Sequence, residues 1–164
     1  PLPPGEAGSI EVCGPNVFHG YWRLPEKTAA EFRDRWFVTG DLGAFDADGY
    51  LSILGRAKDL VITGGLNVYP AEVESALDDL PGVAASAVIG VPHPDFGEAV
   101  VACLVPAPGQ TLDETGLRAG LRDRLAAFKI PKRLIFLNDL PRNAMGKVQK
   151  AALRTTYADM FQDR

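Results

Sequence analysis

The sequence predicts an α+β fold in two parts, a β-rich segment over residues 1–54 and a small α+β domain over residues 59–164, joined at residues 55–58. The 164 residues are 46% hydrophobic and 23% charged, a composition that can bury a core. Before Gly55, short apolar runs alternate with turn residues, and after it helix-spaced apolar residues alternate with β-branched runs. The second pattern predicts a short central sheet flanked by helices.

The first part is expected to consist of short strands and turns. Residues 8–12 have the pattern of a strand, and residues 36–38 lead into a turn at residues 39–41. A second turn at residues 46–49, with Gly supplying a positive φ, reverses the chain into a strand at residues 50–54. These elements predict a hairpin.

The second part is expected to hold three helices and three strands. Pro70 suits a first helical position, and Thr111 with Glu114 forms a capping box. The helices are expected to begin near Pro70, Thr111 and Gln149, and the strands to cover residues 83–91, 99–105 and 133–137. The expected buried helix faces are Val73, Ala76, Leu77 and Leu80; Leu117, Leu121, Leu125 and Phe128; and Leu153, Tyr157, Met160 and Phe161.

Composition and charge narrow the class of protein. The net charge of −4 argues against a nucleic-acid partner, because duplex binding depends on clustered Lys and Arg. No run approaches the roughly 20 apolar residues of a membrane span, and residues 1–6 do not resemble a signal peptide, so we expect a cytoplasmic protein. Cys13 and Cys103 lie outside any metal-ligand spacing, and we expect two buried thiols. Since the chain opens without Met, we expect it to be a piece of a larger protein.

Two polar segments near the boundary are candidates for a ligand site. Asp41 has two acceptor oxygens that suit the two hydroxyls of a ribose, although an Asp in a turn more often bonds its own backbone. The segment Gly55-Arg56-Ala57-Lys58-Asp59 lies between the two parts, where an exposed polar linker is the simpler interpretation. The residues alone leave both alternatives open at both places.

Two glycine-containing segments of the second part are also candidates. Thr63-Gly64-Gly65-Leu66-Asn67 offers backbone without side chains, which suits a tight turn or the close approach of a thin ligand arm. Lys147 follows a Gly and precedes a helix, so its long stem could carry a charge to an anionic centre, or it could be an ordinary surface lysine.

These segments occur together and in one order, and that order resembles the last motifs of the adenylate-forming superfamily, which includes acyl-CoA synthetases, firefly luciferases and the adenylation domains of peptide synthetases. The resemblance covers nearly the whole chain. It is carried by Gly8-Ser9-Ile10-Glu11, Gly20-Tyr21-Trp22, Trp36-Phe37-Val38-Thr39-Gly40-Asp41-Leu42-Gly43, Asp48-Gly49-Tyr50 and Lys147. It implies that residues 1–54 end a large N-terminal domain, that residues 55–58 are a hinge, and that residues 59–164 form a small C-terminal lid domain.

The resemblance implies nucleotide contacts in the first part and a pivot at the boundary. Asp41 would bind the ribose hydroxyls of ATP or AMP, and Arg56 would contact the same nucleotide. Lys58 would be the hinge about which the lid turns between half-reactions. Mg²⁺ would accompany ATP, bound mainly by the missing N-terminal domain, and we expect no metal ligands in this chain.

For the second part, the resemblance implies contacts with coenzyme A and with the reacting groups. Gly64 and Gly65 would line a tunnel for the pantetheine arm, and Lys147 would bridge the substrate carboxylate and the α-phosphate during adenylation. Four basic residues could meet the phosphates of coenzyme A, or form an exposed solvated face: Lys129, Lys132, Arg133 and Arg142.

A finer resemblance, through residues 58–70, 92–98 and 141–150, is to malonyl-CoA synthetases. The expected function is therefore an ATP-dependent acyl-CoA synthetase acting on a small carboxylic acid, with malonate or methylmalonate as first choice. Two alternatives stay open, an adenylation domain that loads a carrier protein and a non-catalytic binding module. Because the chain has no Ser/Thr/Gly-rich phosphate loop, we expect it to be inactive without the N-terminal domain.

Overall fold

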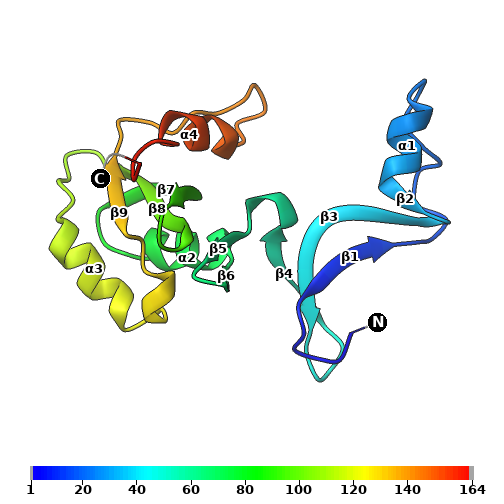
Figure 1. The fold of residues 1–164 in the computed structure, drawn as a ribbon, viewed down its shortest axis with the longest axis horizontal. Helices are drawn as coiled ribbons and strands as arrows, with labels where there is room; N and C mark the ends of the chain where they lie inside the picture. The colour runs from blue at the N-terminus through cyan, green and yellow to red at the C-terminus, as the bar shows by residue number, and fades with distance from the viewer. Residues whose placement is uncertain (1, 163–164) are drawn as a thin grey trace. The chain divides into compact units, whose positions relative to one another are not determined.

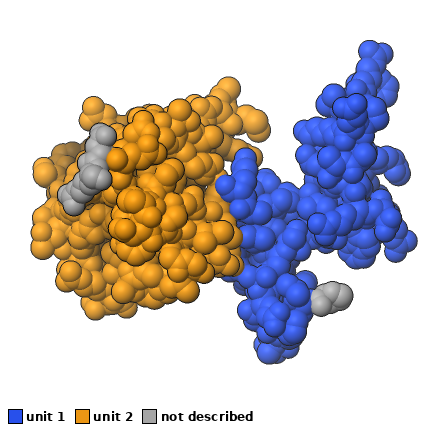
Figure 2. Space-filling model, in the orientation of Figure 1, with its two compact units in different colours: residues 1–58 blue, residues 59–164 orange. Residues whose placement is uncertain are grey.

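The computed structural model describes residues 2–162, and its contacts divide the chain into residues 1–58, called unit 1, and residues 59–164, called unit 2 (Figure 2). Each unit has a sheet of its own (Figure 1). The division falls after Lys58, inside the short 3₁₀ turn η1 (Ala57–Asp59). The predicted α+β class is confirmed.

Unit 1 is an antiparallel sheet with one short helix. Its elements are β1 (Gly8–Val12), α1 (Pro25–Glu31), β2 (Phe32–Arg33), β3 (Trp36–Phe45) and β4 (Leu51–Arg56). β3 is the central strand and pairs with each of the other three. The predicted strand at residues 8–12 and the predicted hairpin are confirmed, and Asp46 Oδ1 closes the hairpin turn by accepting N–H bonds from Asp48 and Tyr50 at 3.0 and 2.8 Å.

In unit 1 one local expectation is wrong, and one helix was not expected. Residues 39–41 do not form a turn but lie within β3, where Gly40 has φ +76° and the register with β4 shifts between Leu42 and Gly43. An irregular strand of this kind keeps its pairing while it re-aims its side chains. The helix α1 was not expected, because none of its residues is buried and it therefore has no apolar face that periodicity could reveal.

Unit 1 has almost no interior among the residues described. Between residues 2 and 58 only Gly43 is buried, while Trp22, Tyr50 and Ile53 are 84%, 73% and 69% exposed. Edge-to-face and tilted ring contacts hold a partly covered aromatic cluster: Phe18, Tyr21, Phe32 and Phe37. Pairing within the sheet, rather than a buried core, therefore organises this unit.

Unit 2 is built around a five-stranded sheet. Its elements are β5 (Val61–Thr63), β6 (Leu66–Val68), α2 (Pro70–Asp78), β7 (Val83–His93), β8 (Gly97–Pro106), α3 (Glu114–Arg122), η2 (Ala127–Lys129), β9 (Arg133–Phe136) and α4 (Lys150–Thr156). β8 is central, pairing with β7 along its length, with β5 at its start and with β9 in parallel further on. The three strands predicted for this part are confirmed.

Both faces of this sheet are covered. Successive strand residues point to opposite faces, and every residue from Ala99 to Leu104 is buried, so neither face of β8 meets solvent. One face packs against α2 and α3 through a core that includes Val73, Leu77, Val88, Val100, Leu104, Leu117 and Leu121. The other packs against α4 and the segment after it through Ile89, Val91, Val101, Cys103, Leu140 and Leu153. Figure 1 shows α2 and α3 apart from α4 around the strands.

The helix α3 begins and ends at other residues than expected. Its N-cap is Asp113, whose carboxylate accepts N–H bonds from Thr115 and Gly116 at 3.2 and 2.8 Å, so the predicted capping box at Thr111 is wrong. α3 ends at Arg122, and Phe128 lies beyond it in η2, 38% exposed rather than on a buried face.

α4 ends at Thr156, so Tyr157, Met160 and Phe161 pack against the core from turns that follow the helix. Both cysteines are free; Cys103 is buried as predicted, whereas Cys13 is only partly buried, which corrects that prediction. Within residues 2–162, no helix combines the length and the apolar character that a membrane crossing needs.

Candidate active site

Asp41 and Arg56 face each other across β3 and β4. They are register partners, and Arg56 Nε lies 3.0 Å from Asp41 Oδ1. Arg56 Nη1 also donates to the carbonyl of Thr39 at 2.8 Å, and the Asp41 N–H donates to Thr39 Oγ1 at 3.1 Å. Among the residues described, the Asp41 carboxylate therefore pairs with Arg56 instead of bonding its own backbone. A carboxylate and a guanidinium held side by side and partly exposed, 29% and 52%, offer both an acceptor and a donor to a polar ligand.

Gly64 and Gly65 form the turn between β5 and β6. Their φ angles are +56° and +79°, the pair of positive values that a two-residue type I′ turn needs. The Gly64 N–H donates to the carbonyl of Phe96 at 2.9 Å, and Glu98 Oε2 accepts the N–H of Ile62 at 2.8 Å. These two bonds fix the glycine hairpin, defined as residues 61–68, to the start of β8. A Cβ at Gly65 would meet nothing within 4 Å, so the turn presents bare backbone to open space.

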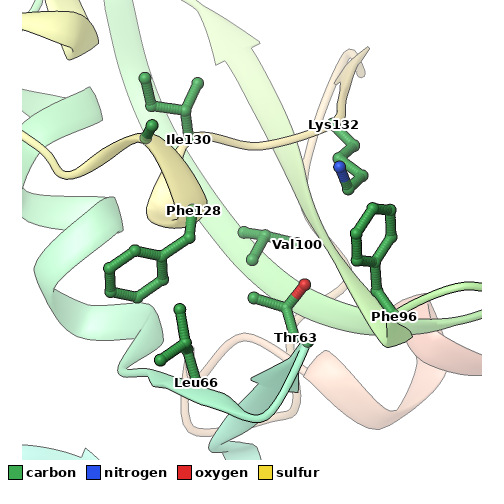
Figure 3. Close-up of a pocket in the computed structure, with 9 residues that line it drawn as sticks. Thr63, Leu66, Phe96, Val100, Phe128, Ile130 and Lys132 are labelled. Carbon is green, nitrogen blue, oxygen red and sulfur yellow. The ribbon is translucent and has the colours of Figure 1, made fainter.

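A cavity of about 270 Å³ opens beside this hairpin. Its lining is Thr63, Gly64, Leu66, Phe96, Val100, Ala127, Phe128, Ile130 and Lys132. Figure 3 shows the rings of Phe96 and Phe128 on either side of Thr63 and Val100, with the amine of Lys132 next to Phe96. Lys132 Nζ lies 4.0 Å from the centroid of the Phe96 ring. The cavity thus combines two aromatic faces, an apolar floor and one cation.

The aromatic residues of this cavity were not predicted as site residues. Phe96 lies in residues 92–98, which contributed only to the resemblance to malonyl-CoA synthetases, and Phe128 was expected on the buried face of a helix. The signal that could have placed Phe128 is Pro131, which cannot continue a helix and therefore makes an irregular segment before it the better expectation.

The four basic residues named from the sequence have different environments. Lys129 Nζ bonds both carboxylate oxygens of Glu72 at 2.6 and 2.8 Å, and Arg142 donates to the Gly146 carbonyl at 2.9 Å. Arg133 is exposed on β9. Only Lys132 among the four lines the cavity described above.

Lys147 lies in an exposed loop that leads into α4. The lysine loop, defined as residues 142–148, begins and ends with a bridge between Arg142 and Val148. Residues 142–147 are all exposed, so the lysine stands outside both cores of unit 2. No residue within 2–162 forms an ion pair with it. Its amine is therefore available to an anion that this part of the chain does not supply.

The candidate residues lie at four places in the chain. Asp41 and Arg56 are in contact in unit 1, and the glycine hairpin with its cavity is one feature of unit 2. Lys147 is not among the residues that line the cavity, so it is a separate feature of the same unit. Lys58 is exposed at the end of unit 1.

Known proteins match this chain along nearly its whole length. Residues 72–147 match the family described as AMP-binding enzyme C-terminal domain. Feruloyl-CoA synthase of an Amycolatopsis species is 50% identical over 157 residues, 96% of this chain and 32% of that protein. ATP-bound MatB from Rhodopseudomonas palustris is 62% identical with a TM-score of 0.88, over 98% of this chain and 32% of the other. The o-succinylbenzoate CoA synthetase MenE from Bacillus subtilis, in complex with the acyl-adenylate OSB-AMP, is 40% identical with a TM-score of 0.89. The match covers 93% of this chain and 31% of that chain. The chain thus spans about a third of the length of these relatives.

Proposed function

Residues 72–147 belong to the family of AMP-binding enzyme C-terminal domains, and from this premise we propose that the chain is the C-terminal part of an ATP-dependent acid–thiol ligase. In the first half-reaction an oxygen of the substrate carboxylate attacks the α-phosphorus of ATP, and pyrophosphate leaves. In the second the sulfur of a thiol attacks the acyl carbonyl carbon, and AMP leaves. The names of relatives support this class, since they include indoleacetate–CoA ligase and 2-succinylbenzoate–CoA ligase.

The availability of Lys147 carries the proposal. The first half-reaction brings a carboxylate and a phosphate together, and their repulsion is lowered by a cation held at the meeting point. A lysine suits this role because its ammonium is a compact charge on a long flexible stem. In the described chain Lys147 is exposed, loop-borne and without an ion-pair partner, as such a residue must be before the anions arrive.

Asp41 and Arg56 are the proposed nucleotide contacts. The Asp41 carboxylate can accept hydrogen bonds from the two ribose hydroxyls through the oxygen lone pairs that Arg56 leaves free. Arg56 holds the carboxylate in place and can donate to the nucleotide with its remaining N–H groups. The pair supports a ribose site better than either residue would alone.

The cavity supports free coenzyme A as the thiol acceptor over a carrier protein. A pantetheine arm needs only a narrow path past bare backbone, which the glycine hairpin offers. The aromatic faces of Phe96 and Phe128 and the amine of Lys132 would have no partner on that arm, whereas the adenine ring and phosphates of coenzyme A would occupy them. Carrier-protein loading therefore remains the second candidate.

Lys58 is the proposed hinge between the two half-reactions. Lys147 and the glycine hairpin are separate features of unit 2, so one placement of the unit serves adenylation and another serves thioester formation. The backbone rotation that separates these two placements would take place at the boundary after Lys58.

Malonate and methylmalonate are the acids we propose first, from the sequence resemblance to malonyl-CoA synthetases. For the Mg²⁺ that accompanies ATP, residues 2–162 contain no group of three or more His, Cys, Asp or Glu able to hold a metal ion. We therefore assign no metal ligand and no metal-dependent step to this chain.

The test is carried out on the full-length ligase. ATP–pyrophosphate exchange is measured with malonate, methylmalonate, ferulate, 2-succinylbenzoate and a medium-chain fatty acid, and thioester formation with coenzyme A, pantetheine and a holo carrier protein. We expect exchange with a dicarboxylate and transfer to coenzyme A. Absence of exchange with every acid would contradict the ligase proposal, and transfer only to the carrier would favour the second candidate. Residues 1–164 alone should catalyse neither step.

A further inference from the structure

We propose that Asn143 is a positioning residue for Lys147, holding the backbone of the lysine so that its amine reaches the reacting anions. This inference rests on the proposed role of Lys147 in adenylation. It concerns a side chain that does not itself touch substrate.

Asn143 bonds both backbone groups of Lys147. Its side-chain Oδ1 accepts the N–H of Lys147 at 3.0 Å, and its own N–H donates to the carbonyl of Lys147 at 2.9 Å. The same Oδ1 accepts the N–H of Met145 at 3.0 Å. One asparagine thus fixes the peptide units on either side of the Lys147 Cα, in the manner of an Asx turn extended by one bond.

Packing does not hold the lysine loop, so its hydrogen bonds decide its shape. Residues 142–147 are exposed, and the side chain of Met145 is 79% exposed. Two further bonds complete the turn: the Gly146 N–H donates to the Asn143 carbonyl at 2.9 Å, and Arg142 Nη1 donates to the Gly146 carbonyl at 2.9 Å. The second bond holds the Gly146–Lys147 peptide unit from its carbonyl side, but neither bond supplies an acceptor for the Lys147 N–H, so loss of Asn143 Oδ1 leaves that N–H without its partner.

The base of the loop is fixed to the rest of unit 2. The Gln149 N–H donates to the Pro141 carbonyl at 2.7 Å, and Lys150 Nζ lies 2.7 Å from Glu74 Oε1 with both side chains largely buried. A rigid base makes the bonds of Asn143 matter, because the position of the Lys147 Cα then depends on the loop alone. A reacting group that is already held in place loses less entropy on reaching the transition state, so the activation barrier is lower. A misplacement of about 1 Å can lower the rate roughly 100-fold.

The test compares four variants of the full-length ligase: N143A, N143S, K147A and N138A. Ala removes the acceptor, and Ser restores a weaker one, since a hydroxyl makes the same turn less well. Asn138 is the matched control, an exposed asparagine for which the described chain shows no side-chain hydrogen bond. Each variant is measured for the single-turnover rate of adenylation, for thioester formation from preformed acyl-adenylate, for KM of ATP, and for Tm.

We expect N143A to slow adenylation roughly 10- to 100-fold, N143S to fall between N143A and the parent, and N138A to stay within twofold of the parent. Thioester formation, KM and Tm should change little, whereas a merely structural defect would lower both half-reactions and Tm together. Hydrogen exchange at the Met145 and Lys147 amides should speed up in N143A. If K147A impairs adenylation and N143A does not, the positioning role of Asn143 is wrong. If K147A itself leaves adenylation intact, the proposed function of the lysine fails and Asn143 fails with it.

Discussion

Arg154 of α4 donates through Nη1 to Oδ1 of Asp59 across 3.0 Å, which joins the last helix to the first residue of unit 2. The two side chains are 30% and 15% exposed, so water screens this pair less than a surface pair. Asp59 follows the proposed hinge residue Lys58, and α4 follows the lysine loop. The pair therefore ties the segment that bears Lys147 to the point at which unit 2 would turn.

We predict that Asp59 and Arg154 are energetically coupled by about 1–2 kcal/mol, between the values for exposed and fully buried pairs. The measurement is a double-mutant cycle with D59N, R154M and the double variant, using urea unfolding followed by circular dichroism. Each single change should lower the free energy of unfolding by more than the same change does when the partner is already replaced. The reason is that each single change leaves one charge partly buried and unpaired. Additive effects of the two changes would contradict the coupling. Arg122→Met, an exposed arginine at the end of α3, is the control.

Unit 2 is predicted to fold without unit 1. Both hydrophobic clusters lie entirely within residues 59–164, whereas residues 2–58 bury only Gly43. Residues 59–164 alone should therefore unfold cooperatively in urea, with a midpoint close to that of unit 2 in the longer chain. Residues 1–58 alone should show the narrow range of amide proton chemical shifts that is typical of an unfolded peptide. Since Trp22 and Trp36 both lie in unit 1, tryptophan fluorescence of residues 1–164 should not follow the main transition seen by circular dichroism.

Lys147→Ala is predicted to damage one half-reaction of the full-length ligase. Adenylation should slow by about 10²–10³, equivalent to about 3–4 kcal/mol of lost stabilisation of the transition state. Thioester formation from preformed acyl-adenylate should be spared, because the phosphate and carboxylate no longer have to be brought together. Lys27→Ala, an exposed lysine of α1, should affect neither step. Equal losses in both half-reactions would contradict the role assigned to Lys147.

Phe96→Ala and Phe128→Ala are predicted to weaken the binding of coenzyme A without weakening the binding of pantetheine. Loss of one stacking face costs about 1–3 kcal/mol, so KM for coenzyme A should rise roughly 5- to 150-fold. KM for pantetheine and the rate of adenylation should stay unchanged, since neither involves an aromatic face of the cavity. Phe136→Ala, an exposed phenylalanine on β9 outside the cavity, is the control. Parallel increases in KM for both acceptors would place the nucleotide elsewhere.

The parts of the fold that follow from local pattern could be predicted from the sequence. β7 and β8 contain Val-rich runs joined by a turn at residues 94–96 that includes Pro94, and the hairpin of β3 and β4 has its Asp–Gly turn. β5 and β6 could not be predicted, because three-residue strands carry no measurable period. They are held by long-range bonds to β8 and to the residue before it, from the Ile62 N–H to Glu98 and from the Gly64 N–H to the Phe96 carbonyl.

Of the candidate site, too, one part could be predicted from the sequence and another could not. The bonds of Asn143 to Lys147 span four residues, so an Asx-turn signal could have pointed to them. The cavity could not be predicted, because Phe96 and Phe128 line the same cavity only after β8, α3 and η2 have folded around one another. The contact of Asp41 with Arg56 needed the register of β3 against β4, which a bulge shifts by one residue.

Cys103 is predicted to make the stability of unit 2 fall at alkaline pH. It lies fully buried in β8, and burial raises the pKa of its thiol from 9.0 to about 11. Burial, and then the nearby Cys103, also raise the pKa of Tyr157. Because the pKa of this thiol is higher in the folded state, its full contribution to the stability of the fold is present below pH 9. That contribution is lost as the pH rises towards 11, because the thiol of the unfolded chain ionises first. The loss is at most about 2–3 kcal/mol. Urea unfolding of the chain and of C103A between pH 8 and 11 tests this: the decline should be shallower in C103A, and parallel pH profiles would show that another group is responsible.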